Sequence, residues 1–234
     1  PMSAEDGFTI HAQPLIDAFT ERTRLVLVNS PCNPTGGTIS AADLRRLGEH
    51  CAERGAVLLC DETYERFLYD GAEHASGADL ARDLPESVVV VSSFSKTYSM
   101  TGWRLGWAAG PETVIRKVLE VQSHATSNPT SFAMHGALAA LRHAENDVRA
   151  MISAFAERRQ TVVAALSALD GSELWRSEDG VTWEQPSASD GVNGHPIRGI
   201  TASYVDSCLE RKNRSGSPSS SSMAKRRVFR TLTW

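Results

Sequence analysis

Short apolar runs alternate along this chain with longer stretches of helical periodicity. Residues 24–28, 56–60 and 88–91 form runs that consist almost entirely of apolar side chains, as in strands that are buried on both faces. Helical patterns separate these runs, and such an alternation favours a mostly parallel sheet that is covered by helices. We therefore expect an α/β fold.

Capping and breaking residues mark where the expected helices begin and end. Ser40 is suited to begin a helix in which Leu44 and Leu47 fall on one face, and Gly55 is suited to end it. Further helices are expected at residues 111–122, 131–141 and 145–169.

The pattern fades after about residue 171. Residues 171–234 contain only ten Leu, Ile, Val or Phe in 64 positions, together with twelve serines. So low a share of large apolar residues is typical of chains that do not form a packed core. We expect residues 1–170 to form the folded part of the chain and residues 171–234 to be an atypical, weakly ordered segment.

Composition narrows the classes of function. The 234 residues carry a net charge of −4, which favours neither nucleic acid nor a membrane as the main partner. The four cysteines have no zinc-site spacing, and no apolar run approaches membrane-spanning length. We expect a cytoplasmic protein.

Residues that carry chemistry follow each of the three apolar runs. Because ligands of open α/β sheets bind beyond the carboxyl ends of the strands, these residues are expected to converge. A lysine amine can form an imine with a carbonyl cofactor, a carboxylate can keep a pyridine nitrogen protonated, and hydroxyls with a guanidinium can hold a phosphate. The candidates are Asn33, Asp61, Tyr64, Ser93, Ser95, Lys96 and Arg104.

Each candidate taken alone also has a structural interpretation. Asn33 could belong to an ordinary turn, Asp61 could cap one, and Arg104 could form a surface ion pair. Trp103 and Trp107 alternate with Arg104 and are expected to pack along one strand. The coincidence of several signals at matching strand ends favours the functional interpretation.

Four segments together carry a resemblance to a known family. Listed in chain order, they are Asn33-Pro34-Thr35-Gly36, Asp61-Glu62-Thr63-Tyr64, Ser93-Phe94-Ser95-Lys96 and Gly102-Trp103-Arg104-Leu105-Gly106. Over about residues 8–170 the chain resembles the fold-type I pyridoxal-phosphate enzymes, specifically the class I/II aminotransferases. The resemblance implies that residues 1–170 are part of the cofactor-binding large domain of an aspartate aminotransferase-like fold.

The resemblance also implies roles at the pyridine ring. Lys96 would link covalently to pyridoxal 5′-phosphate as the internal aldimine and would later carry a proton between the substrate Cα and the cofactor. Asp61 would pair with the ring nitrogen, while Asn33 and Tyr64 would contact the ring oxygen.

The phosphate would be held by Ser93 and Arg104, with Ser95 as a further candidate. Asn128 would lie near the cofactor of a partner subunit, because family active sites form at a homodimer interface. Family members continue in both directions beyond the segment that this chain resembles, so we expect a fragment whose residues 171–234 replace the small domain.

The residues leave three functions open. The first is an aminotransferase that moves an amino group between an amino acid and a 2-oxo acid. The second is a lyase or synthase on the same scaffold, because such enzymes share every cofactor residue named above. The third is a non-catalytic cofactor-binding fragment. Nucleic-acid binding through the short basic run at residues 225–227 is disfavoured, since such runs are usually solvated.

Overall fold

A four-stranded sheet forms the centre of the molecule. The computed structural model describes residues 2–3 and 6–167, so the segment expected to be weakly ordered, residues 171–234, lies outside the described residues. The strands are adjacent in chain order: β1 (Leu25–Asn29), β2 (Val57–Asp61), β3 (Val88–Ser93) and β4 (Gly106–Ala109). The first three are parallel and β4 is antiparallel to β3, which confirms the expected mostly parallel sheet.

The helix between the first two strands follows its sequence signals. Helix α2 (Ala41–Glu53) begins at Ser40, whose hydroxyl accepts a hydrogen bond from the Asp43 amide. Leu44 and Leu47 are both buried, and Gly55 follows the helix with a φ of 63°. Glycine adopts this left-handed conformation without strain, which explains why the helix ends here.

The main core lies between one face of the sheet and the helices α1 (Ala12–Asp17), α2 and α3 (Gly77–Ala81). Leu47 and Leu58 are fully buried there. The opposite face is open at the edge strand β1, where Leu25 and Leu27 are 54% and 57% exposed. The prediction that this run is buried on both faces is therefore wrong for β1 within the described residues, because α1–α3 cover only one face.

The segment before β4 is a turn rather than a strand. Trp103 lies in the short 3-10 helix η1 (Thr101–Trp103), and Arg104 has a left-handed backbone with φ 59°. Only Trp107 lies on β4, so the prediction that Trp103, Arg104 and Trp107 share a strand is wrong. The turn replaces the strand because the Trp103 ring packs against α6, where Gly136 leaves room for it.

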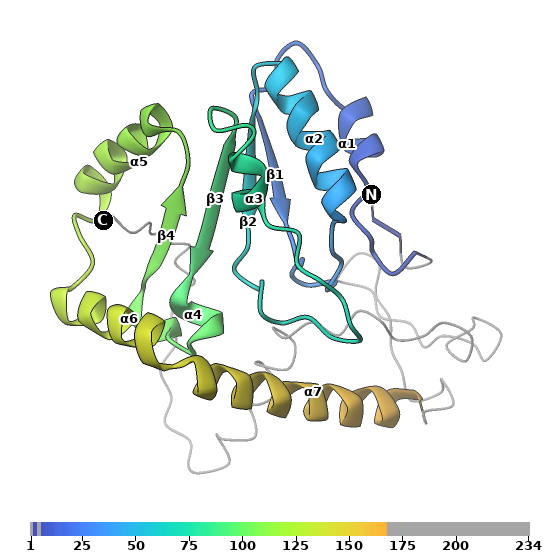
Figure 1. The fold of residues 1–234 in the computed structure, drawn as a ribbon, viewed down its shortest axis with the longest axis vertical. Coiled ribbons are helices and arrows are strands. Elements are labelled where there is room, and N and C mark those ends of the chain that lie inside the picture. Colours follow the sequence, from blue (N-terminus) through green and yellow to red (C-terminus); the bar gives the residue numbers. More distant parts are fainter. Residues whose placement is uncertain (1, 4–5, 168–234) are drawn as a thin grey trace, which may run out of the picture.

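Four more helices complete the described chain: α4 (Phe94–Thr97), α5 (Glu112–Ala125), α6 (Ser131–His143) and α7 (Glu145–Ser167). Helix α5 extends three residues beyond its expected end at residue 122. Helix α7 crosses the end of the sheet at which the three parallel strands terminate (Figure 1). No helix of the described residues is long and apolar enough to span a membrane.

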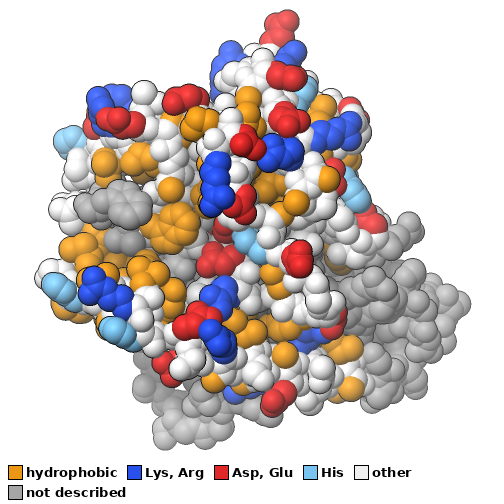
Figure 2. Space-filling model, viewed as in Figure 1, with side chains coloured by type: hydrophobic (Ala, Val, Ile, Leu, Met, Phe, Trp, Pro, Cys, Tyr) orange, Lys and Arg blue, Asp and Glu red, His pale blue; other side chains and the backbone are white. Residues whose placement is uncertain are grey.

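Helix α7 is attached to the segment that follows β2. Phe155 of α7 packs edge-on against Phe67 with ring centroids 5.6 Å apart. Arg159 binds Asp70 at 2.8 Å, and Arg66 binds Glu145 at 2.8 Å. The helix therefore supports the loop in which Tyr64 lies. In the same view, toward the β4 edge of the sheet, apolar side chains gather over β4, α5 and α6 (Figure 2).

Candidate active site

The carboxyl ends of the three parallel strands meet as the sequence predicted. Asn29 at the end of β1 is the register partner of Asp61 at the end of β2, and Asp61 is also paired with Val91 of β3. Just beyond β1, the amide of Ser30 donates to the Asp61 carbonyl at 3.1 Å. These contacts place the three following loops side by side.

Asn33, Tyr64 and Lys96 form a cluster at this edge. The Asn33 amide Nδ2 donates to the Tyr64 hydroxyl Oη over 3.2 Å. The Lys96 ammonium Nζ lies 5.6 Å from the centroid of the Tyr64 ring, close enough for a cation–π attraction. Residues from three different strand ends, 63 positions apart at most (96 − 33), are thus brought together.

Asp61 is held by the turn that it begins. Its carboxylate oxygen Oδ1 accepts from the amide of Thr63 at 3.1 Å and from the Thr63 hydroxyl at 2.8 Å. Both of these bonds are made to one oxygen, which leaves Oδ2 for a further donor. Side chains of this kind that bond their own backbone two residues on are common in tight turns.

Ser93, Ser95 and Arg104 lie at the β3–β4 side of the site. The Ser93 hydroxyl accepts from the Ser95 amide at 3.3 Å and so caps the one-turn helix α4 that carries Lys96. Ser93 is the register partner of Gly106, two residues after Arg104. The Arg104 guanidinium itself donates to the Thr101 carbonyl at 2.7 Å, a contact within its own turn rather than to Ser93.

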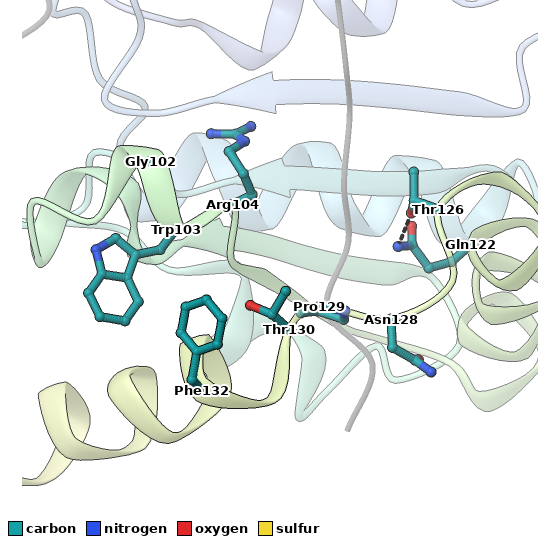
Figure 3. A pocket seen from close by; sticks show the side chains of 9 residues that line it. All are labelled: Gly102, Trp103, Arg104, Gln122, Thr126, Asn128, Pro129, Thr130 and Phe132. Carbon is teal, nitrogen blue, oxygen red and sulfur yellow. Dashed lines mark hydrogen bonds between the residues drawn. The ribbon is translucent and has the colours of Figure 1, made fainter.

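A cavity of about 240 Å³ adjoins this side of the site. Arg104 and Asn128 line it together with the rings of Trp103 and Phe132, and the Arg104 guanidinium points away from both rings (Figure 3). Lys96 is not among the residues of its wall. The cavity is therefore a neighbour of the cluster and does not contain it.

Asn29 is a site residue that the sequence analysis missed. Its side-chain Oδ1 accepts a hydrogen bond from the backbone amide of Asn33 at 2.9 Å, and its Nδ2 donates one to the backbone carbonyl of Asp61 at 3.2 Å. One side chain therefore connects the loop after β1 to the end of β2. An asparagine at the last position of a strand, directly before a proline-rich turn, was the available signal.

A second missed residue is Glu65, which follows Tyr64. Its carboxylate accepts a hydrogen bond from the Ser92 hydroxyl at 3.0 Å. Burial raises the pKa of Glu65 above its ordinary value, although the Ser92 hydrogen bond opposes the shift. Glu65 thus connects the loop after β2 to the end of β3.

The sequence model of the family described as "Aminotransferase class I and II" matches residues 1–189. The chain belongs to the class I and II aminotransferases. The match extends beyond residue 170, where the motifs had indicated that the resemblance ends. It covers every candidate residue from Asn33 to Arg104.

Individual aminotransferases show the same relation. The aspartate aminotransferase of Bacillus subtilis is 36% identical over 208 residues, which are 89% of this chain and 52% of that protein. The aspartate aminotransferase of Geobacillus stearothermophilus is 41% identical over 167 residues, 71% of this chain and 42% of that protein. This aminotransferase chain spans about half the length of the curated relatives it matches.

Solved aminotransferases share its fold. The crystal structure of the aspartate aminotransferase from Rhizobium meliloti matches with a TM-score of 0.67 at 40% identity, over 72% of this chain and 42% of that one. The aromatic aminotransferase of Pyrococcus horikoshii matches with a TM-score of 0.67 at 35% identity, over 71% and 45%. The expected aspartate aminotransferase-like fold is confirmed.

Proposed function

We propose that this chain is part of a pyridoxal 5′-phosphate-dependent aminotransferase, which moves an amino group between an amino acid and a 2-oxo acid. The observation that carries the proposal is the cluster of Asn33, Tyr64 and Lys96 beside Asp61 at one edge of the sheet. An amine, a carboxylate, an amide and a phenol are the groups that suit a phosphorylated pyridine aldehyde. Membership of the aminotransferase family supports the same cofactor.

The residues around Asp61 would bind the ring. When bound, pyridoxal phosphate supplies an electron-accepting ring that stabilises negative charge on the substrate Cα. The Asp61 carboxylate would pair with the protonated ring nitrogen, and it has an oxygen for this role because both Thr63 hydrogen bonds go to Oδ1. Asn33 Nδ2 and Tyr64 Oη are donors suited to the ring oxygen, and their mutual hydrogen bond keeps them adjacent.

Ser93, Ser95 and Arg104 would hold the phosphate. Hydroxyls and a guanidinium form charge-assisted hydrogen bonds with phosphate oxygens. Arg104 has five N–H donors, and its bond to the Thr101 carbonyl engages one of its nitrogens. The remaining donors suit a dianion next to Ser93.

Lys96 would be the residue of this chain that takes part in covalent attachment and proton transfer. Its amine Nζ would attach the cofactor and, once released by the substrate, would carry a proton between the substrate Cα and the carbon of the cofactor's aldehyde group. The Tyr64 ring, 5.6 Å away, keeps this amine at the edge of the sheet where the other residues converge.

Relatives supply a first substrate to assay. Several are named aspartate aminotransferase, and one of Aquifex aeolicus is named probable aspartate/prephenate aminotransferase. We include aspartate, with a 2-oxo acid as acceptor, in the proposal. A homodimer, the position of Asn128 near a partner's cofactor, and a cytoplasmic location stay predictions from the sequence.

The decisive experiment is reductive trapping. The chain is incubated with pyridoxal phosphate, reduced with borohydride and mapped by peptide mass spectrometry. We expect the label on Lys96, its loss in Lys96→Ala, and its retention in the matched variant Lys117→Ala, since Lys117 lies exposed on α5. A label spread over other amines, or none, would contradict the proposal. Amino-group transfer from aspartate, measured in parallel with ammonia release, separates an aminotransferase from a lyase.

A further inference from the structure

Glu62 is a buried carboxylate between two candidate cofactor residues. It directly follows Asp61 and precedes Tyr64 by two positions, yet it is only 6% exposed. Successive side chains of an extended segment point to opposite faces, so Glu62 enters the protein on the side away from Asp61. A carboxylate is buried at such a place only when other groups compensate for its lost hydration.

Among the described residues, the partners of the Glu62 carboxylate come from residues 74–77, the segment that leads into α3. The Gly77 amide donates to one Glu62 oxygen at 2.6 Å, and the Ser76 hydroxyl lies 2.9 and 3.1 Å from the two oxygens. His74 Nε2 is 3.0 Å from the carboxylate, an ion-pair distance when the ring is protonated, although its angle is outside hydrogen-bond geometry. The carboxylate thus fixes this segment against the end of β2.

The backbone of Glu62 is fixed as well. Its amide donates to the Val91 carbonyl at 2.9 Å, and the Ser92 hydroxyl is 3.3 Å from its carbonyl oxygen. Gly77 packs closely against β2, because a Cβ added at Gly77 would lie 2.6 Å from the Cys60 sulfur. Glu62 is therefore held by β3 through its backbone and by residues 74–77 through its side chain.

We propose that Glu62 is a positioning residue, which holds the turn of residues 61–64 so that Asp61 and Tyr64 face the cofactor. This inference rests on the function proposed above. The turn is also bonded within itself, since the backbone amide and the hydroxyl of Thr63 both donate to the Asp61 carboxylate. Rotation at Glu62 would therefore displace the groups on both sides of it together.

The test compares Glu62→Gln with Glu73→Gln in the full 234-residue chain. Glu73 is an exposed carboxylate beside the same segment, so it controls for the loss of one charge. Amide hydrogen exchange of the cofactor-free protein reports the turn, and borohydride trapping reports pyridoxal phosphate at Lys96. In Glu62→Gln we expect exchange at residues 61–64 to accelerate about tenfold relative to β1 and β3, and trapping at Lys96 to fall about tenfold, as for a lost hydrogen bond to a charged group.

Glu73→Gln should match the unmodified chain in both measurements. If Glu62→Gln fails to fold, Ser76→Ala takes its place, because it removes the hydroxyl and leaves the Gly77 bond. It should give a smaller change in the same direction. Unchanged exchange at residues 61–64, or acceleration that is uniform over the sheet, would overturn the inference, because a residue with a purely structural role acts on the whole fold.

The two proposals fail in different measurements. If the unmodified chain shows no label at Lys96, the proposed function fails. The exchange comparison is made without cofactor and still decides whether Glu62 holds the turn. If the label is present and Glu62→Gln labels normally, the function stands and the positioning role is lost.

Discussion

Asn29→Ala is the substitution that best tests how the site is assembled. The Asn29 side chain accepts from the Asn33 amide at 2.9 Å and donates to the Asp61 carbonyl at 3.2 Å. Alanine removes both bonds without adding bulk. It leaves the strand pairing of β1 and β2 intact, since that pairing uses backbone groups.

The size of the effect follows from what can replace each bond. A typical intramolecular hydrogen bond contributes about 0.5–1.5 kcal/mol net, so two contribute about 1–3 kcal/mol. Asn33 is exposed, and water can reach its amide; the Asp61 carbonyl keeps its bond from Ser30. Both facts favour the lower part of the range, about 1–2 kcal/mol.

Urea denaturation measures this loss. With a slope of about 2 kcal/mol per molar urea, the midpoint should fall by about 0.5–1 M. Asn146→Ala, at an exposed position of α7, is the matched control and should shift the free energy of unfolding by less than about 0.5 kcal/mol. An Asn29→Ala midpoint equal to that of the control would refute the reasoning.

A double-mutant cycle with Tyr64→Phe asks whether Asn29 acts on the site through Asn33. Asn33 is bonded to Asn29 through its backbone and to Tyr64 through its side chain. Connected residues give coupling energies of about 0.5 kcal/mol or more, whereas independent ones add. If the losses in the free energy of unfolding are additive, the two hydrogen bonds of Asn33 are energetically independent.

Two further substitutions test packing and ionisation. In Gly136→Ala the new Cβ would lie 2.6 Å from the Trp103 ring, so we expect the half-exposed ring to move outward and its fluorescence to shift to the red. The higher helix propensity of alanine offsets the loss of stability by about 1 kcal/mol. Gly102→Ala, whose Cβ meets open space, should leave the spectrum unchanged, and equal spectra for the two variants would contradict the prediction. Burial first, and the Glu62 charge second, raise the pKa of the Cys60 thiol from 9.0 to about 12. The contribution of the protonated thiol to the free energy of unfolding is therefore intact below pH 9, and it falls above pH 9 by at most about 1.4 kcal/mol per pH unit. Cys60→Ala should flatten the fall of the urea midpoint between pH 9 and 11, and an unchanged slope would contradict the assignment.

The parts of the fold that were predictable depend on local patterns. The three apolar runs became β1, β2 and β3 with each end shifted by at most two residues, because short continuous apolar runs are a local signal for strands. Ser40 and Gly55 fixed the ends of α2 through capping chemistry that needs no distant partner. The convergence of Asn33, Tyr64 and Lys96 followed from topology, since parallel strands end at one edge.

The parts that failed depend on partners far along the chain. Trp103 was assigned to a strand because it alternates with Trp107, but its ring packs on Gly136 of α6, 33 residues later (136 − 103). The exposed face of β1 could not be inferred either, since an apolar run looks the same whether one face or both are covered. Asn29 and Glu65 were missed because their roles lie in one or two side-chain hydrogen bonds to neighbouring segments of the chain.

The contrast between features that depend on local patterns and features that depend on distant partners indicates which part of the site is most sensitive to substitution. Asp61 is the last residue of β2, and Asn33, Tyr64 and Lys96 each lie within four residues after the end of a parallel strand. The pairing of these strands therefore fixes where the four residues lie. Arg104 has no such support. Its left-handed turn precedes β4 and depends on a ring that is seated on another helix. Phosphate binding should therefore be more sensitive than ring binding to substitutions in α6, even though no residue of that helix belongs to the cluster.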